Sequence, residues 1–343
     1  MRKKWKFWTS IAILSMMLAA CGSGGGESEE TAPDGTPDEG EANTEETVEY
    51  KIGATQIVEH PSLDAAYEGF KQAIADAGLN ATYDFQSAQN DENNASVIAS
   101  NFVADEVDLI FANSTPSALA ALQATSEIPI VFTSVTDPVG SGLVPSMDEP
   151  GANITGVVDL HPDAIQFTVE VIDKYFSGAR VGLIYNAGEA NSVAQIEAVE
   201  EAAKDTSLSI VTRTVSSSAE VQQAASTLVS EVDVFYIVTD NTVVSALESV
   251  VSVANEQQIP LVVGEPDSLA RGGFATYGID YYSIGYRSGE MAVEILTGEK
   301  TPADIPVEYP SDMKLIINKE AAELQGVEWN SEWDEIAEIY TGE

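Results

Sequence analysis

Residues 49–78 read EYKIGATQIVEHPSLDAAYEGFKQAIADAG, and this stretch decides the fold. Residues 49–54 predict a strand, and residues 55–61 predict a polar loop. Ser62 can then cap a helix whose apolar residues recur at three- and four-residue spacing, and Gly78 ends that helix. A short strand followed by a loop and an amphipathic helix is one βα unit.

The rest of the body repeats this unit in two series. The first series has further strands near 81–85, 107–112 and 128–133, with helices near 94–104 and 116–125. A stretch that contains Pro and Gly, 144–157, leads into a second series with helices near 162–176, 192–203, 219–229 and 243–256 and strands near 180–185, 208–215, 232–238 and 260–263. A tail adds a strand at 274–278, a helix at 281–296 and a strand at 314–318. This rhythm predicts an α/β protein with two doubly wound, Rossmann-like lobes and a hinged cleft between them, where the carboxyl ends of the strands face a ligand.

The composition fits a two-lobed globular body and excludes one class of partner. Hydrophobic residues make up 44% of the 343, enough for two cores of ordinary size. The chain has 15 Lys and Arg against 56 Asp and Glu, a formal charge of -41. Such a surface repels phosphate backbones, so no nucleic-acid partner is expected. The acidity suits an exported surface in a saline or alkaline medium, and an acid-dependent role in ligand binding is the alternative.

The N-terminus predicts export and a lipid anchor. Residues 1–6 are basic and residues 7–20 form an apolar run too short for a comfortable membrane span, so residues 1–20 are expected to be a cleaved signal peptide. Leu18-Ala19-Ala20-Cys21 resembles a bacterial lipobox, in which the cysteine is lipidated. Cys21 is the only cysteine, so an internal disulfide is impossible; an ordinary thiol beside a signal anchor is the other interpretation. Residues 21–48 are acidic and rich in Gly, which predicts a lipidated, disordered tether at the outer face of the membrane.

Six runs in the body resemble the periplasmic-binding-protein type I superfamily, in particular substrate-binding proteins of ABC importers linked to tryptophan and other aromatic amino acids. Their order and spacing carry the resemblance. The runs are TQIVEHP (55–61), STPSA (114–118), VFTSVTDPVG (131–140), GEANS (188–192), TDNT (239–242) and ATYGIDY (275–281).

The resemblance implies a division of the chain, a ligand and a partner. Residues 49–157 with 281–300 would form the first lobe, and residues 158–280 with 301–343 the second. The ligand would be a small solute, with tryptophan, phenylalanine or tyrosine as the best choices, and an ABC permease in the membrane would recognise the closed form. A monomer without cofactor or metal is expected.

Ser114 and Thr115 are the candidate ligand residues of the first lobe. They follow an apolar strand and precede Pro116 at the start of a helix. Hydroxyl groups at a helix N-terminus suit a carboxylate, so these residues could hold the carboxylate of an amino acid. Ordinary capping of the helix without a ligand is the alternative.

Two pairs of residues are the candidates of the second lobe. Asn191 and Ser192 open the first helix after the strand at 180–185, and capping explains them equally well. Asp240 and Asn241 follow the strand at 232–238, where the carboxylate of Asp240 could accept the ammonium group of the ligand. Capping is again the competing account.

The remaining candidates are weaker and come from other strand ends. Thr136 and Asp137 precede Pro138, so a rigid turn explains them as well as a ligand does. An aromatic ring of the ligand could pack on Tyr185 or Tyr281. His60 is expected to be a loop histidine rather than a catalyst. The other ligand candidates are Gln56, Glu265, Tyr185 and Tyr281.

Two other functions are alternatives to solute import. An enzyme is disfavoured because the sequence lacks a phosphate loop, a Gly-x-Ser-x-Gly elbow and a His-Glu-x-x-His helix, and it has only two histidines. A carboxylate-dependent enzyme stays open as a minor alternative. A receptor lipoprotein that reports to a membrane sensor kinase would share the fold, anchor and cleft.

Overall fold

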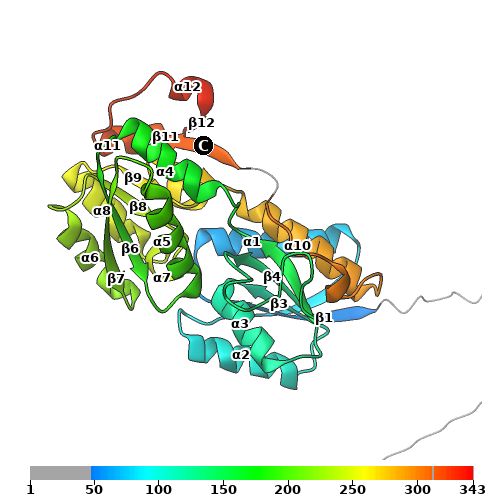
Figure 1. Ribbon diagram of the computed structural model, residues 1–343. Coiled ribbons are helices and arrows are strands. Elements are labelled where there is room, and N and C mark those ends of the chain that lie inside the picture. The colour runs from blue at the N-terminus through cyan, green and yellow to red at the C-terminus, as the bar shows by residue number, and fades with distance from the viewer. Residues whose placement is uncertain (1–47, 311–312, 343) are drawn as a thin grey trace, which may run out of the picture. The chain divides into compact units, whose positions relative to one another are not determined.

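Two parallel sheets organise the protein, which a computed structural model describes for residues 48–310 and 313–342 (Figure 1). The described residues belong to one unit of the chain. The expected signal peptide, Cys21 and the tether through residue 47 lie outside the described residues. None of the described helices is long and apolar enough to cross a membrane.

The first sheet has the strand order β2-β1-β3-β4-β5, with all pairs parallel. Its strands are β1 (Glu49–Gln56), β2 (Asn80–Ser87), β3 (Leu109–Asn113), β4 (Ile130–Val135) and β5 (Ile154–Val158). Its helices are α1 (Pro61–Asp76), α2 (Glu92–Ala104) and α3 (Thr115–Ala124). Every residue of β3, β4 and β5 is buried, as expected for strands covered on both faces. This sheet and the helices packed on it are the first lobe.

The second sheet repeats that order as β7-β6-β8-β9-β10 and adds β11 and β12 at one edge. β11 is antiparallel to β10 and β12 is parallel to β11, so these two strands run opposite to the other five described strands of this sheet. The strands are β6 (Arg180–Asn186), β7 (Ser209–Val215), β8 (Val234–Ile237), β9 (Leu261–Val263), β10 (Ala275–Gly278), β11 (Lys314–Asn318) and β12 (Glu338–Tyr340). The helices are α4 (Ala164–Tyr175), α5 (Ala190–Ala203), α6 (Val221–Leu228), α7 (Asn241–Val244), α8 (Leu247–Gln257), α9 (Pro266–Ala270), α11 (Lys319–Leu324) and α12 (Trp333–Ile336). This sheet and these helices are the second lobe.

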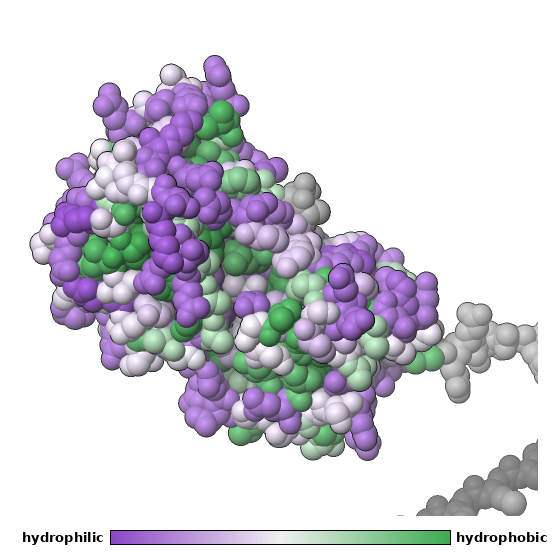
Figure 2. Space-filling view, viewed as in Figure 1, coloured by the Kyte–Doolittle hydropathy of each residue, from purple (hydrophilic) through white to green (hydrophobic). Residues whose placement is uncertain are grey.

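Three apolar cores stabilise the two lobes. One core fills the first lobe around Phe70, Phe102, Phe111 and Phe132, all fully buried. Two further cores lie in the second lobe. On the face shown in Figure 2, hydrophilic residues are spread over both lobes with smaller apolar groups between them. This distribution fits the strongly acidic composition, because charged side chains must remain in water.

Helix α10 (Tyr281–Leu296) returns to the first lobe and packs along α1 (Figure 1). Glycines permit this close packing. A Cβ atom on Gly285 would lie 1.9 Å from the carbonyl oxygen of Ala66, and a Cβ atom on Gly69 would lie 2.1 Å from that of Tyr282. The two backbones therefore approach at a distance that no larger residue allows.

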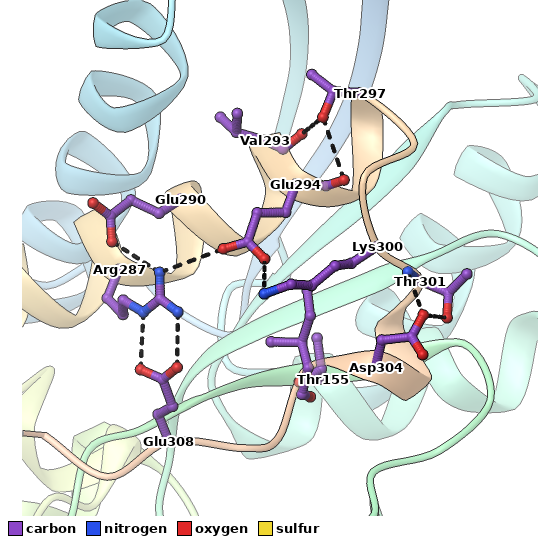
Figure 3. A network of polar contacts seen from close by, with 11 residues as sticks. Thr155, Arg287, Glu290, Val293, Glu294, Thr297, Lys300, Thr301, Asp304 and Glu308 are labelled. Atoms are coloured by element: carbon purple, nitrogen blue, oxygen red, sulfur yellow. Dashed lines mark hydrogen bonds and ion pairs between the residues drawn. The ribbon is translucent and has the colours of Figure 1, made fainter.

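Arg287 connects α10 through hydrogen bonds to the segment that follows it, which contains Glu308 (Figure 3). Its Nε and Nη2 atoms donate to the two carboxylate oxygens of Glu308, each at 2.8 Å, and Nη1 donates to Glu290 at 2.9 Å. These carboxylates raise the pKa of Arg287. Ile305 and Val307 also pack in the core of the first lobe, so the chain crosses to the second lobe after residue 308 rather than at residue 301, where the sequence analysis placed the division.

Several elements of the structure differ from those that the sequence predicts. The stretch 144–157 was interpreted as a connection, yet 154–158 forms β5; a Cβ atom on Gly156 would lie 2.1 Å from the carbonyl oxygen of Phe132. The helix expected at 243–256 is two helices, α7 and α8, which are separated at residues 245–246. The short elements α9, α11, α12 and β12 were not expected.

Candidate functional site

A small pocket lies between the two lobes, at the carboxyl ends of their strands. Its wall comes from the loops after β1, β5, β8 and β9, from the end of β4, and from the first turns of α1, α5, α7 and α10. Its cavity volume is about 10 Å³, room for about one water molecule, so a larger solute can enter only if the lobes separate. The lining residues are His60, Leu63, Ser134, Asp159, Asn191, Thr239, Asp240, Asn241, Val244, Glu265 and Tyr281.

Three buried carboxyl groups give the pocket its chemical character. Burial raises the pKa of Asp159 to about 6 and also raises the pKa of Glu265. The pKa of Asp240 is raised by burial and, secondarily, by the neighbouring charge of Glu189. Among the described lining residues there is no Lys or Arg. Because buried carboxylates are costly without a positive partner, this wall favours a ligand that carries a positive group.

Asp159 is held by two hydroxyl groups. Tyr281 donates to its Oδ2 atom at 2.9 Å, and Thr136 donates to its Oδ1 atom at 3.0 Å. Tyr281 opens α10, and Asp159 follows β5 directly. These bonds therefore fix a carboxylate at the point where the chain passes between the lobes.

Asp240 is held at the start of α7. Its Oδ1 atom accepts the backbone N–H of Val243 at 2.8 Å, and its Oδ2 atom accepts the backbone N–H of Asn186 at 2.6 Å. Glu189 lies beside it and accepts hydrogen bonds from Asn241 and Thr242. Two carboxylates thus meet where β6 and β8 end, with neutral donors around them.

Three polar atoms of lining residues have no hydrogen-bond partner among the described residues: His60 Nδ1, Ser134 Oγ and Asn191 Oδ1. Burial, followed by the charge of Arg271, lowers the pKa of His60 to about 3, so its imidazole is neutral at pH 7. A β-bulge between Phe132 and Val135 turns Ser134 into the pocket wall, with φ of +56°. Unpaired buried polar groups cost free energy, and a polar ligand would satisfy them.

Five of the candidates from the sequence meet at this pocket, and two more support it. The side chain of Ser192 opposes the rise in the pKa of Asp240, and Thr136 donates a hydrogen bond to Asp159. The five that line the pocket are Asn191, Asp240, Asn241, Glu265 and Tyr281.

The other five candidates lie outside the lining. Ser114 and Thr115 are buried at the start of α3; Ser114 caps that helix with a strained φ of +110°, and the hydroxyl of Thr115 has no partner among the described residues. Gln56 is buried and donates to Asp64 at 2.8 Å. Asp137 accepts the backbone N–H of Gly140 at 2.7 Å, in a turn, and Tyr185 packs against the core of the second lobe.

Sequence reasoning missed Asp159, Ser134, Leu63, Thr239 and Val244 and set His60 aside as a loop residue. Asp159 was missed because β5, the strand before it, was not expected. Ser134, Thr239 and Glu189 lie within runs that carried the family resemblance, and that was the available signal. Leu63 and Val244 follow helical spacing like any core residue, so no sequence signal separates them.

Comparison with known proteins agrees with this geometry. Residues 51–338 match the family model described as ABC transporter substrate binding protein. A "Tyrosine-binding protein" of Clostridioides difficile is 44% identical over 282 residues, which cover 81% of each chain.

Two solved structures are also similar to this chain. One is an ABC domain from Streptococcus pneumonia in complex with L-Trp, with a TM-score of 0.81 and 31% identity over 85% of this chain and 100% of that one. The other is the ligand-free, open structure of a substrate-binding protein with adhesive properties from Clostridium difficile, with a TM-score of 0.63 and 39% identity over 86% of this chain and 100% of that one. The family and these relatives are binding proteins, not enzymes. The chain therefore belongs to the ABC transporter substrate-binding protein family and has the periplasmic-binding-protein type I fold, with two parallel-sheet α/β lobes.

Proposed function

We propose that this protein binds an aromatic amino acid between its lobes and delivers it to the permease of an ABC importer. The observation that carries the proposal is the group of three buried carboxyl groups, Asp159, Asp240 and Glu265, in a pocket lined by no Lys or Arg among the described residues. An amino acid brings the ammonium group that such a wall needs. The relative named for tyrosine and the complex with L-Trp support the aromatic class.

The ammonium group of the ligand is assigned to the carboxylates of Asp240 and Asp159. Both carboxylates are held in place by hydrogen bonds from neutral groups, so ligand binding does not require either of them to break an ion pair. Each would gain a charge-assisted hydrogen bond, which is about twice as strong as a neutral one. The raised pKa of each carboxyl group would then fall towards its ordinary range.

The other ends of the ligand are assigned to the first lobe and to the apolar lining. The unpaired hydroxyl of Ser134, which lines the pocket, is a donor for the carboxylate. Leu63, Val244 and the ring of Tyr281 offer contacts for an aromatic side chain. Tyr185, whose ring packs on the core of the second lobe, is not assigned a contact.

Separation and closure of the lobes are part of the proposal. The cavity is too small to admit an amino acid unless the lobes open. The structure is more similar to the complex with L-Trp than to the ligand-free, open structure, with TM-scores of 0.81 and 0.63, although the open protein is the more identical in sequence, at 39% against 31%. The higher TM-score to the complex than to the open structure supports a closed arrangement of the two lobes in this protein. A ligand that contacts both lobes would stabilise that arrangement by its differential affinity.

The membrane anchor belongs to the same proposal. Binding proteins of ABC transporters act outside the cytoplasm, and a diacylated Cys21 would hold this one beside its permease.

The proposal is tested by a thermal-shift screen with matched analogues. We expect L-tyrosine, L-tryptophan or L-phenylalanine to raise the unfolding temperature; a ligand at 100 times its dissociation constant adds about 2.7 kcal/mol. For the amino acid that binds, the analogue without the ammonium group should give no shift, because the carboxylates then lack their partner. Equal shifts from the amino acid and its deaminated analogue would refute the assigned role of the acidic wall. No shift with any aromatic amino acid would refute the ligand class.

A further inference from the structure

Glu189 is a buried carboxylate that bonds to a helix other than its own. It stands at the N-cap of α5 but its side chain accepts no backbone N–H of that helix, and it is 4% exposed. Its Oε2 atom accepts from the backbone N–H of Asn241 at 3.1 Å and from the side-chain amide at 2.6 Å. Its Oε1 atom accepts from the backbone N–H of Thr242 at 3.1 Å and from the hydroxyl at 2.7 Å. No ion pair found among the described residues includes Glu189, so neutral donors alone hold its charge.

Capping of α7 alone does not explain this arrangement. Asp240 already accepts the backbone N–H of Val243 and serves as the cap. A second buried carboxylate beside Asp240 is electrostatically unfavourable, since like charges repel most strongly where water is excluded. The contacts of Glu189 with side chains, which it makes in addition to those with the backbone of α7, therefore indicate its role.

Two of those side chains face the pocket. The amide of Asn241 donates to Glu189, and Nδ2 of Asn191 lies 3.4 Å from the same carboxylate oxygen. Both asparagines line the pocket. Nδ2 of Asn191 also donates to the carbonyl oxygen of Thr239 at 3.2 Å, so Glu189 shares in the orientation of this amide. The oxygen Oδ1 of Asn191 has no partner among the described residues and is available to a ligand.

The third side chain contacts the other lobe. The hydroxyl of Thr242 donates to Glu189 and accepts from Nδ2 of Asn90 at 2.8 Å. Asn90 lies in the turn between β2 and α2, and its backbone N–H donates to Ile57 at 2.7 Å, which fixes the turn to the first lobe. The bond between Asn90 and Thr242 therefore joins the lobes at a point outside the pocket lining.

We propose that Glu189 is a positioning residue for solute binding, which orients Asn191 and Asn241 towards the ligand and Thr242 towards Asn90 of the opposite lobe. This inference rests on the proposed function. One buried carboxylate then links the shape of the pocket wall to a contact that exists only when the lobes are closed.

The test compares the affinity of full-length variants for L-tyrosine. Glu189→Ala should weaken binding at least about ten-fold, because donors normally paired with a charged group lose their partner. Glu189→Gln, which keeps an acceptor, should recover most of that loss. Glu220→Ala is the matched control, because Glu220 also accepts a backbone N–H and a hydroxyl, both from Ser216, but is exposed and outside the pocket. Wild-type affinity in Glu189→Ala, with the wild-type protein binding, would overturn the inference.

A double-mutant cycle separates positioning from general stability. Asn90→Ala should weaken binding in the wild type but have a smaller effect in Glu189→Ala, where the hydroxyl of Thr242 has lost its carboxylate acceptor. In the absence of ligand, the effects of Asn90→Ala and Glu189→Ala on the unfolding temperature should be additive. Fully additive effects on affinity would overturn the inferred link between the lobes.

Hydrogen exchange provides a readout that needs no ligand. The backbone amides of Asn241 and Thr242 should exchange at least about ten-fold faster in Glu189→Ala and near the wild-type rate in Glu189→Gln, since these amides donate to the carboxylate. If no aromatic amino acid binds the wild type, the proposed function fails and these rates decide the positioning role by themselves. Unchanged rates in Glu189→Ala would overturn it.

Discussion

The hydroxyl of Tyr281 lies 2.9 Å from Oδ2 of Asp159 and is its donor at the pocket wall. This bond connects the first residue of α10 with the residue that follows β5, so it spans the place where the chain passes between the lobes. Both side chains are buried, at 3% and 8% exposure.

Removal of this hydroxyl gives the first prediction. Tyr281→Phe keeps the ring and leaves Asp159 with the hydroxyl of Thr136 as its remaining side-chain donor. We expect a loss of about 1–3 kcal/mol in unfolding free energy, the usual cost when a buried carboxylate loses a donor. Affinity for the aromatic amino acid should also fall, and denaturant titration and calorimetry measure the two effects. An unchanged affinity would show that ligand binding does not depend on the hydrogen bond from Tyr281 to Asp159.

The titration of Asp159 predicts a pH dependence of stability. Burial raises its pKa in the folded protein to about 6, from an ordinary value of 3.8. Between these values the folded protein binds more protons at this site than the unfolded chain does, so its contribution to stability is fully present below about pH 4 and is lost as the pH rises through 6. Asp159 should therefore lower the unfolding free energy as the pH rises from 4.5 to 7.5. Asp159→Asn removes this contribution, so on the same change of pH its unfolding free energy should gain on that of the wild type by on the order of 1–3 kcal/mol. Identical pH profiles would contradict the assignment.

The contact between α1 and α10 predicts a severe effect of one methyl group. In Gly285→Ala the new Cβ atom would meet the backbone of Ala66 at 1.9 Å, so the helices must move apart. Overpacking of this kind costs about 1–3 kcal/mol, which corresponds to a fall of several degrees in unfolding temperature. Ala75→Ser, which adds one atom at an exposed position of α1, is the control and should leave that temperature nearly unchanged. Equal unfolding temperatures for the two variants would contradict the close packing.

These features differ in how far the sequence could predict them. The apolar runs and helical spacings identified the two series of βα units, since burial on both faces imposes those patterns. The strand β5 was not predicted because Thr155 and Gly156 interrupt an apolar run of only five residues. Without that strand, Asp159 could not be recognised as a residue at a strand end. The position of the chain's crossing after Glu308 depends on its pairing with Arg287, which no local pattern encodes.

The candidate site shows the same limit. Polar residues near strand ends were the signal available, and the five of them that line one pocket are Asn191, Asp240, Asn241, Glu265 and Tyr281. The bonds from Glu189 to Thr242 span 53 positions and depend on two loops that become neighbours only when β6 and β8 pair. Whether a strand-end residue faces the pocket or caps its own helix, as Ser114 does, depends on backbone angles that spacing does not reveal.

Replacement of the single cysteine tests the proposed anchor. Cys21→Ser removes the sulfur that would carry the diacylglycerol. We expect the wild type in the membrane fraction and the variant largely released from it, with ligand affinity unchanged. Mass spectrometry of the wild-type N-terminal peptide should detect the lipid. A variant that stays in the membrane fraction like the wild type would contradict lipid anchoring at this residue.

The central claim is that the acidic pocket between the lobes binds an aromatic amino acid. Its most direct test is isothermal titration of L-tyrosine into the wild type, Asp240→Asn and the control Asp137→Asn, whose carboxylate lies in a turn outside the lining. We predict one binding site per chain in the wild type and the control, and at least about a ten-fold weaker affinity in Asp240→Asn, the loss expected for one buried charge-assisted bond. Equal affinity in all three proteins would contradict the claim.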